Sequence, residues 1–269
     1  MTLSKTARAG LAFLAMLLVG AIVAPYASPW SVEQIDWARM AVAPGTGGHW
    51  FGTDRLGRDL FVRTFAGVRV SMLIALAATL VSLVIGVTWG AVAGYAGGRV
   101  DAVLMRVVDV LYSLPYVFFV ILLTVVFGRR PTTVFIAIGA VGWLTMARVV
   151  RGEARRLRER EFIEAAIATG LPARTILWRH VLPNLAGPVL VYATLTVPGM
   201  ILIESFLSFL GLGIQEPAAS LGNLMAAGAA DMEAAPWMLL VPCSCLVAMV
   251  LALGVVGEGL RDALDPHAR

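Results

Sequence analysis

The sequence is poor in charged residues. Charged side chains make up 14% of its 269 residues, against about 25% in an average soluble domain. Hydrophobic residues make up 59%, and no stretch is both long and polar enough to bury a core of its own. The net charge of +4 does not indicate a nucleic-acid partner, because the basic residues are spread over the connections between apolar runs. The composition therefore predicts an integral membrane protein in a lipid bilayer.

The sequence also lacks the usual elements of catalysis and cofactor binding. Its two cysteines, Cys243 and Cys245, are two positions apart in an apolar run, a spacing that suits neither a zinc site nor a redox CxxC pair. The phosphate-binding pattern GxxxxGK[ST] is missing, so any ATP and magnesium that the function requires would have to be bound by another chain. The apolar runs contain no catalytic Ser/His/Asp constellation. We therefore predict a protein that is not an enzyme and that binds no cofactor or metal.

Six apolar runs predict an all-α fold of six transmembrane helices. The first follows Lys5 and Arg8, and we interpret it as a membrane span rather than a signal peptide because no clear cleavage site follows it. The third span is expected to kink at Pro115. The expected spans cover residues 9–24, 70–95, 104–127, 133–147, 185–207 and 237–256. The expected divisions are an N-terminal transmembrane helix (1–26), an external loop (27–69), a core of five transmembrane helices (70–257) and a tail (258–269).

Three glycines in the second span predict close helix packing. Gly86, Gly90 and Gly94 are spaced by four, which places them on one helix face. Small residues on such a face let a neighbouring backbone approach closely. The pattern concerns packing and says little about a substrate.

The distribution of Lys and Arg predicts the orientation in the membrane. With both termini inside, the inner segments hold fourteen of the 21 basic residues and the outer segments seven. Basic residues favour the cytoplasmic side. Both termini and the polar segment at residues 151–183, which we call the coupling loop, are therefore predicted to be cytoplasmic.

The external loop contains the run His49 to Asp59, HWFGTDRLGRD. Thr53 or Asp54 is expected to cap a short amphipathic helix whose apolar positions include Leu60, Phe61 and Phe65. Such a helix would lie along the membrane surface before the second span. The alternative is a solvated loop with one amphipathic turn.

The coupling loop reads as two short helices around a glycine. Glu161 and Glu164 suit the positive end of a helix dipole, Ala165 and Ala166 would leave a small surface for close approach, and Gly170 would end the helix in a left-handed cap. Leu171 and Pro172 then start a second segment. We predict a docking surface for a cytoplasmic partner; the alternative is a loop that only sets the topology. The predicted coupling residues are Glu161, Glu164, Ala165, Ala166, Gly170, Leu171 and Pro172.

Two acidic residues fall inside the predicted spans, where a charge costs at least about 2.5 kcal/mol unless it has a partner or water. Asp109 lies three residues after Arg106, so a local ion pair is one interpretation. Glu204 has no basic residue within four positions. Both are candidates for lining a path through the membrane or facing a partner chain, and an interfacial position in water is the alternative for Glu204.

These motifs resemble those of a known family. Glu164-Ala165-Ala166, Gly170 and Leu182-Pro183 are similar to the EAA loop of permease subunits of bacterial ABC importers. Four further blocks resemble the dipeptide, oligopeptide and nickel importer permeases, specifically the C member of the permease pair. One departure is His180, where isoleucine is usual. The four blocks are His49–Asp59, Gly94–Asp101, Leu207–Gly213 and Gly257–Pro266.

The resemblance implies a function. The chain would be a multi-pass permease subunit in a bacterial inner membrane, paired with a paralogous permease, two cytoplasmic ATPases and an external solute-binding protein. Short peptides are the expected substrate, with nickel or glutathione as alternatives. A gradient-driven secondary transporter is a more distant alternative, although no internal repeat supports it. Residues expected at an external gate or binding-protein contact are Asp54, Arg55, Arg58 and Asp59.

Overall fold

A computed structural model describes residues 4–128 and 131–264 of the chain. Arg129, Arg130, Asp265, Pro266 and Arg269, which enter the charge count or the motifs above, lie outside the described residues. The described regular structure is helical, apart from isolated bridges such as Ile35 with Arg58. The helices are α1 (Lys5–Ala27), α2 (Leu60–Ala96), α3 (Gly98–Tyr112), α4 (Tyr116–Phe127), α5 (Pro131–Arg158), α6 (Glu161–Ala168), α7 (Ala173–Ile176), the π-helical turn η1 (Leu177–Val181), α8 (Leu182–Phe209), α9 (Leu221–Ala230) and α10 (Trp237–Leu264).

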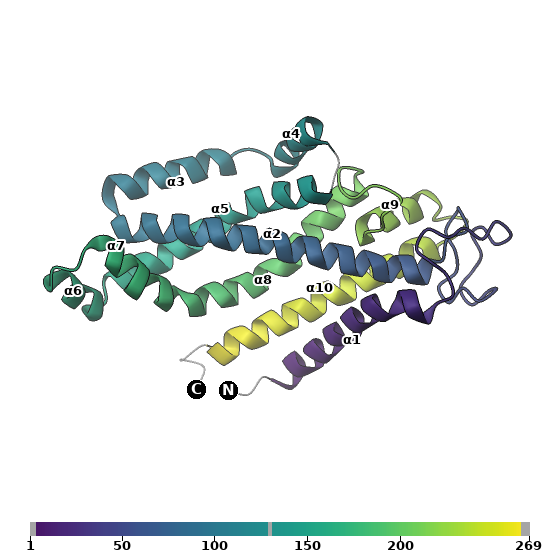
Figure 1. The fold of residues 1–269 in the computed structure, drawn as a ribbon, viewed down its shortest axis with the longest axis horizontal. Helices are drawn as coiled ribbons and strands as arrows, with labels where there is room; N and C mark the ends of the chain where they lie inside the picture. The colour runs from purple at the N-terminus through teal and green to yellow at the C-terminus, as the bar shows by residue number, and fades with distance from the viewer. Residues whose placement is uncertain (1–3, 129–130, 265–269) are drawn as a thin grey trace.

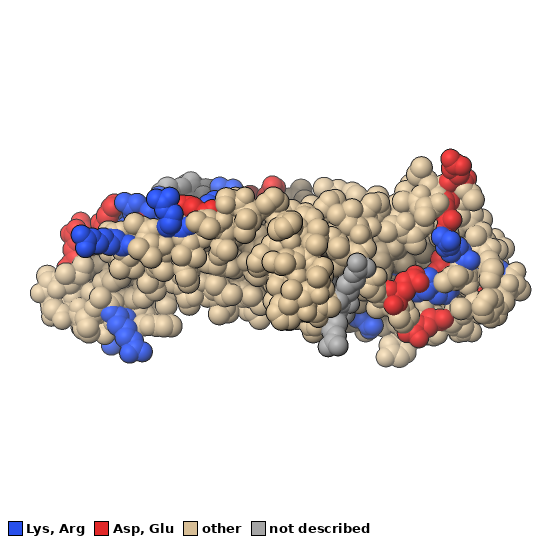
Figure 2. Space-filling model, turned by 90° about the horizontal axis from the view of Figure 1, so that it is seen from above, with Lys and Arg blue, Asp and Glu red and all other residues tan. Residues whose placement is uncertain are grey.

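The long helices form an elongated bundle of membrane-spanning elements. Five of those described are long and apolar enough to cross a membrane, and the bent pair α3 and α4 makes up to six. They run side by side along the long axis, with α6 and α7 at one end and residues 28–59, the outer segment, at the other (Figure 1). Figure 2 shows charged side chains toward the two ends and a broad uncharged band between them. This arrangement is that of a multi-pass membrane protein.

Local sequence explains where several helices begin. Asp59 caps α2, because its carboxylate accepts a hydrogen bond from the Val62 amide. Ser4 caps α1 through the Ala7 amide, and Ser220 forms a capping box with Asn223 at the start of α9. Each cap satisfies an amide that the helix itself leaves without a partner.

The glycine face of α2 packs on α5. A side chain at Gly86 would come within 2.6 Å of Met146, and one at Gly90 within 2.9 Å of Val150. One at Gly94 would lie 2.8 Å from Ala154. The glycines therefore allow the two backbones to approach where any side chain would hold them apart.

The external loop differs from the expectation. We expected a separate surface helix, capped by Thr53 or Asp54, before the second span. Within the described residues, α2 instead starts at Leu60 and runs for 37 residues without interruption. Leu60, Val62 and Ala66 are buried, so this apolar stretch packs inside the protein rather than along the membrane surface.

The third span also differs from the expectation. We expected one kinked helix over residues 104–127, but α3 and α4 meet at 81° across a break before Tyr116. Pro115 has no amide hydrogen to continue the ladder of α3, and it stands at the start of α4. The chain therefore changes direction at an exposed break at the edge of the bundle.

Two other helices end later in the chain than the sequence predicts. The fourth span was expected to end near Ala147, whereas α5 continues to Arg158. The expected polar tail after residue 257 continues α10 as far as Leu264. Helix α9 lies in the connection between α8 and α10, and its ten residues are too few to span a membrane.

Candidate functional site

Helix α6 ends in the cap that the sequence predicts. Gly170 has φ +77°, a conformation that favours glycine. Its amide donates to the Ile167 carbonyl at 2.9 Å, and the Leu171 amide donates to the Ala166 carbonyl at 3.3 Å. These two bonds form a Schellman motif, which fixes the turn between α6 and the following segment.

One face of the coupling loop packs against the rest of the chain. Ile163, Ala166, Ile176 and Val181 are buried in a cluster that includes Val150 and Ala154 of α5, Ala91 of α2 and Leu185 of α8. Helix α6 therefore packs directly on the long helices. Ala166 belongs to this inner face, which corrects the expectation that it forms part of a surface for a partner.

The other face of the coupling loop is open and partly apolar. The large side chains of Phe162, Ile167 and Leu171 are exposed, with Ile167 at 51%. Glu161, Glu164, Ala165, Gly170 and Pro172 are exposed as well. Among the predicted coupling residues, six therefore lie on the outer surface and Ala166 does not. Exposed aromatic and aliphatic residues beside acidic ones are typical of a protein contact.

The outer segment holds a buried cluster of charges. Arg58 donates to Asp54 at 2.6 Å and to Glu216, in the connection between α8 and α9, at 2.7 Å. Arg63 of α2 lies 3.6 Å from Asp54 and 3.4 Å from Glu216. We call Asp54, Arg58, Arg63 and Glu216 the ionic cluster. The hydrogen bond from Arg58 holds the pKa of the Glu216 carboxyl below its ordinary value, so the carboxylate stays charged.

A histidine completes the packing of the outer segment. His49 is fully buried and stacks on Trp30 at a centroid distance of 4.3 Å. Its Nδ1 lies 2.8 Å from Asp59, the residue that caps α2. Asp59 therefore joins the outer segment to the start of α2.

These contacts change the role of the residues expected at an external gate. Asp54, Arg58 and Asp59 are at most 7% exposed, so their charges are satisfied inside the chain and do not present a surface to another protein. Arg55 differs, because its side chain is 61% exposed and lies 3.7 Å from Asp231. Of the four, Arg55 alone keeps the expected accessibility.

Asp109 forms a different ion pair from the one expected. Arg148 of α5 donates to it at 2.9 Å, in place of the pair with Arg106 that the spacing suggested. The Arg148 guanidinium also lies 4.1 Å from the centre of the Tyr112 ring. The pair therefore joins α3 to α5, and both of its side chains remain at least 40% exposed.

Glu204 lies inside the chain. It is 0% exposed and accepts a hydrogen bond from Ser208 at 2.8 Å. Ser208 accepts one from the Ile214 amide, so the carboxylate and its serine hold the end of α8 to the following turn. The expected alternatives, a path, a partner or interfacial water, all require an accessible side chain, which the structure does not give Glu204.

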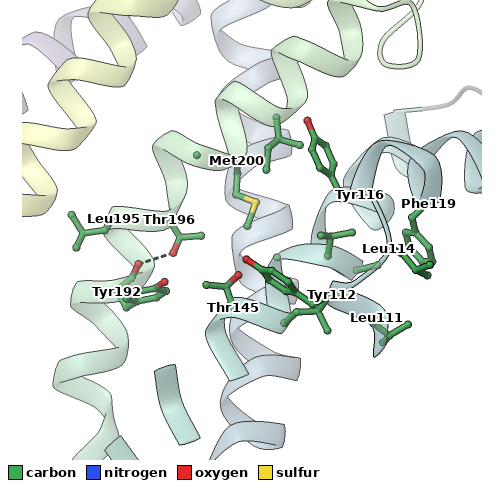
Figure 3. Close-up of a pocket in the computed structure, with 16 residues that line it drawn as sticks. Leu111, Tyr112, Leu114, Tyr116, Phe119, Thr145, Tyr192, Leu195, Thr196 and Met200 are labelled. Carbon is green, nitrogen blue, oxygen red and sulfur yellow. Dashed lines mark hydrogen bonds between the residues drawn. The ribbon is translucent and has the colours of Figure 1, made fainter. Parts of the chain in front are cut away.

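A cavity of about 510 Å³ lies between α3, α4, α5 and α8. Figure 3 shows Tyr192, Thr145 and Tyr112 across one end and Tyr116 beyond Met200 toward the other. All sixteen lining residues are uncharged. Sequence reasoning missed this cavity, although Pro115 marked the break between α3 and α4 that opens it. Elsewhere in residues 4–128 and 131–264, no group of His, Cys, Asp and Glu is arranged to hold a metal.

Comparisons with known proteins agree with these features. Residues 86–269 match the model of the family described as binding-protein-dependent transport system inner membrane component. The chain is 49% identical to the oligopeptide transport system permease protein OppC of Haemophilus influenzae, over 99% of this chain and 86% of that protein. It is 43% identical to the dipeptide transport system permease protein DppC of Bacillus subtilis, over 99% and 83%.

The fold is also similar to a solved structure. An inward-facing structure of the MetNI methionine ABC transporter matches with a TM-score of 0.58, over 74% of this chain and 94% of that one. The two sequences are 17% identical, so this likeness concerns the fold.

Proposed function

The chain belongs to the family of binding-protein-dependent transport system inner membrane components, and on this basis we propose that it is a permease subunit of an ATP-driven importer of short peptides. The observation that carries the proposal is the identity of 49% with an oligopeptide permease along almost the whole chain. The multi-helix bundle and the shape of the coupling loop agree with this assignment. Nickel and glutathione are the alternative substrates.

ATP hydrolysis belongs to separate subunits in this proposal. The exposed face of α6 and its cap, with Glu161, Glu164, Ala165, Gly170, Leu171 and Pro172, would contact an ATPase. Phe162 and Ile167 would add apolar area to the same contact. Ala166 and Ile163 would transmit the movement inward, because both pack on α5.

The remaining partners follow from the family. A second, paralogous permease would pair with this chain, a second ATPase would bind that permease, and an external solute-binding protein would deliver the peptide. The complex would lie in a bacterial inner membrane. The end of the bundle that carries α6 and α7 would face the cytoplasm, and the outer segment would face the binding protein, with Arg55 as an exposed contact.

Co-purification of the complex tests this function. The tagged chain is isolated from membranes in mild detergent, and bound ATPase and ATP hydrolysis are measured for the wild type and for a Glu164→Arg/Gly170→Trp variant. We expect the wild type to retain the ATPase and the variant to lose it while remaining in the membrane. Both residues lie on the exposed face of the coupling loop. Glu164→Arg reverses a charge on that face, and Gly170→Trp adds a bulky side chain at φ +77°, which also strains the turn after α6.

The matched control reverses an exposed acidic charge far from the coupling loop. Glu233→Arg, in the connection after α9, is expected to keep the ATPase. If the wild type brings down no ATPase, the importer assignment is wrong and a gradient-driven transporter becomes the better hypothesis. If the Glu164→Arg/Gly170→Trp variant keeps a fully active ATPase, the importer assignment stands and the docking surface lies elsewhere.

A further inference from the structure

Tyr112 has an unusual position at the end of a broken helix. It is the last residue of α3, directly before the break that separates α3 from α4. It lines the cavity together with Thr145 of α5 and Tyr192 of α8 (Figure 3). The residue is 50% exposed, so the rest of the chain covers it only in part. An aromatic ring is thus presented at one end of an uncharged cavity.

This end of the cavity is the one nearer the coupling loop. Helix α8 leads away from the coupling loop, and Tyr192 precedes Met200 and Ile203 along it. Helix α5 leads toward the coupling loop, and Thr145 follows Ala140 along it. The three residues Tyr112, Thr145 and Tyr192 therefore form the inner end of the cavity.

The Arg148 guanidinium stacks on the Tyr112 ring and holds it in place. It lies on α5 one turn beyond Thr145, stacks on the ring at 4.1 Å and donates to Asp109 at 2.9 Å. Asp109 is on the same face of α3 as Tyr112, one turn earlier. A planar guanidinium that makes both contacts restricts the ring to a narrow set of positions.

A second ion pair keeps α3 and α5 in register. Arg151 makes two hydrogen bonds to Asp101, in the first turn of α3. With Asp109 and Arg148, it connects the start and the end of α3 to the same helix. Helix α5 continues to the coupling loop, so α3 and its last residue follow the movement of α5.

We propose that Tyr112 sets the width of the inner end of a passage for peptide side chains through this cavity, and that Arg148 is its positioning residue. The inference rests on the proposed function, since it takes the cargo to be a short peptide. The uncharged lining gives no group that would select peptides by charge. The Tyr112 ring can still select peptides by size. Peptides with bulky side chains therefore pass the inner end of the cavity more slowly than peptides with small ones.

The test compares two peptides of equal charge in the complete importer, reconstituted in vesicles with its binding protein. Transport of Ala-Trp-Ala is divided by transport of Ala-Ala-Ala for each variant. This ratio cancels differences in the amount of assembled complex, and the unchanged binding protein contributes equally throughout. We expect Tyr112→Ala to raise the ratio about fivefold, the factor that corresponds to relieving a steric cost of about 1 kcal/mol. Tyr112→Phe keeps the ring and should leave the ratio unchanged.

The positioning role of Arg148 is tested by asking whether the effect of its substitution on the transport ratio requires the Tyr112 ring. Arg148→Gln should also raise the ratio, because the Tyr112 ring is no longer held in place. Arg148→Lys keeps a cation that can pair with Asp109, so it should change the ratio less. In the Tyr112→Ala background, Arg148→Gln should have no further effect. The matched control is Arg156→Gln, an exposed arginine further along α5 whose hydrogen bond goes to Glu153; it should leave the ratio unchanged.

Three outcomes would overturn the proposal. A ratio unchanged by both Tyr112→Ala and the milder Tyr112→Leu places the passage elsewhere. An equal effect of Arg148→Gln with and without the Tyr112 ring shows that Arg148 acts independently. If the wild-type complex hydrolyses ATP but transports neither peptide, the peptide assignment fails and this inference fails with it. Peptide transport with an insensitive ratio overturns the inference alone.

Discussion

At the scale of single residues, the outer segment shows why a charge-rich motif need not be a binding surface. Arg58 lies within hydrogen-bond distance of Asp54 and Glu216, and its side chain is 8% exposed. Burying a charge is costly, and here a partner of opposite sign compensates it on each side. Asp54, Arg58 and Asp59 therefore fix the outer segment to α2 and to the connection before α9.

The cost of removing Arg58 is a direct prediction. Arg58→Gln would leave Asp54 buried with only the more distant Arg63 as a counter-charge. Losing one partner of a buried pair typically costs about 3–5 kcal/mol, so the thermal midpoint of the purified protein should fall by several degrees. Arg55→Gln is the matched control, since an exposed pair contributes at most about 1 kcal/mol. Equal shifts for the two variants would contradict the structural role of Arg58.

Asp109 and Glu204, the two acidic residues within the predicted spans, also have partners inside the chain. Sequence reasoning identified Asp109 and Glu204 as residues that need a partner, and both have one. The partner of Asp109 comes from another helix, 39 positions away, and Glu204 interacts with serines on its own helix. The demand for a partner is a property of the residue, whereas the choice of partner depends on how the helices pack.

At the scale of elements, the contact between α2 and α5 depends on residues without side chains. Gly86, Gly90 and Gly94 bring the two backbones together over about two turns. Because α5 leads into the coupling loop, this contact joins the second span to the segment that would receive the ATPase. The four-residue spacing could be read from the sequence, but the identity of the neighbouring helix could not.

Alanine substitutions at two glycines measure this contact. A side chain at Gly90 would collide with the backbone carbonyl of Ala147 and lie 2.9 Å from the Arg151 amide, so Gly90→Ala should destabilise the protein by about 1–3 kcal/mol. Gly152, on α5, has no atom within 4 Å of such a side chain. Gly152→Ala should be neutral or slightly stabilising, since alanine favours helix by up to about 1 kcal/mol.

Thermal unfolding in detergent, followed by tryptophan fluorescence, distinguishes the two glycine variants. Both substitutions add one methyl group to a helical glycine, so the difference between them reports the helix contact rather than helix propensity. A Gly90→Ala midpoint at or above that of Gly152→Ala would show that α2 and α5 can separate at no cost.

At the scale of the whole molecule, the orientation in the membrane is predicted by charge and by the position of the coupling loop. Six passes would place the start of α1 and the end of α10 on one side, and Figure 1 shows both helices running from the outer segment toward the end that carries α6 and α7. Fourteen of the 21 basic residues fall on the segments assigned to this side. The distribution favours a cytoplasmic coupling loop.

Single cysteines test the orientation. In a background with Cys243→Ala and Cys245→Ala, Arg55→Cys on the outer segment should react with a membrane-impermeant maleimide in intact cells. Thr169→Cys, exposed at the end of α6, should react only after the membrane is opened. The reverse pattern would place the coupling loop outside and contradict the proposed contact with an ATPase.

The sequence by itself determined the class of protein, the apolar segments, the glycine face and the Schellman cap at Gly170, because each depends on residues close together in the chain. The tertiary structure decided the rest. Arg58 meets Glu216 across 158 positions, and the break at Pro115 becomes a cavity only when α5 and α8 cover it. Contacts between distant segments are set by how whole helices pack. The residue pattern of one helix does not show which other helix packs against it. This is why the coupling loop was predicted while the ionic cluster and the Tyr112 cavity were not.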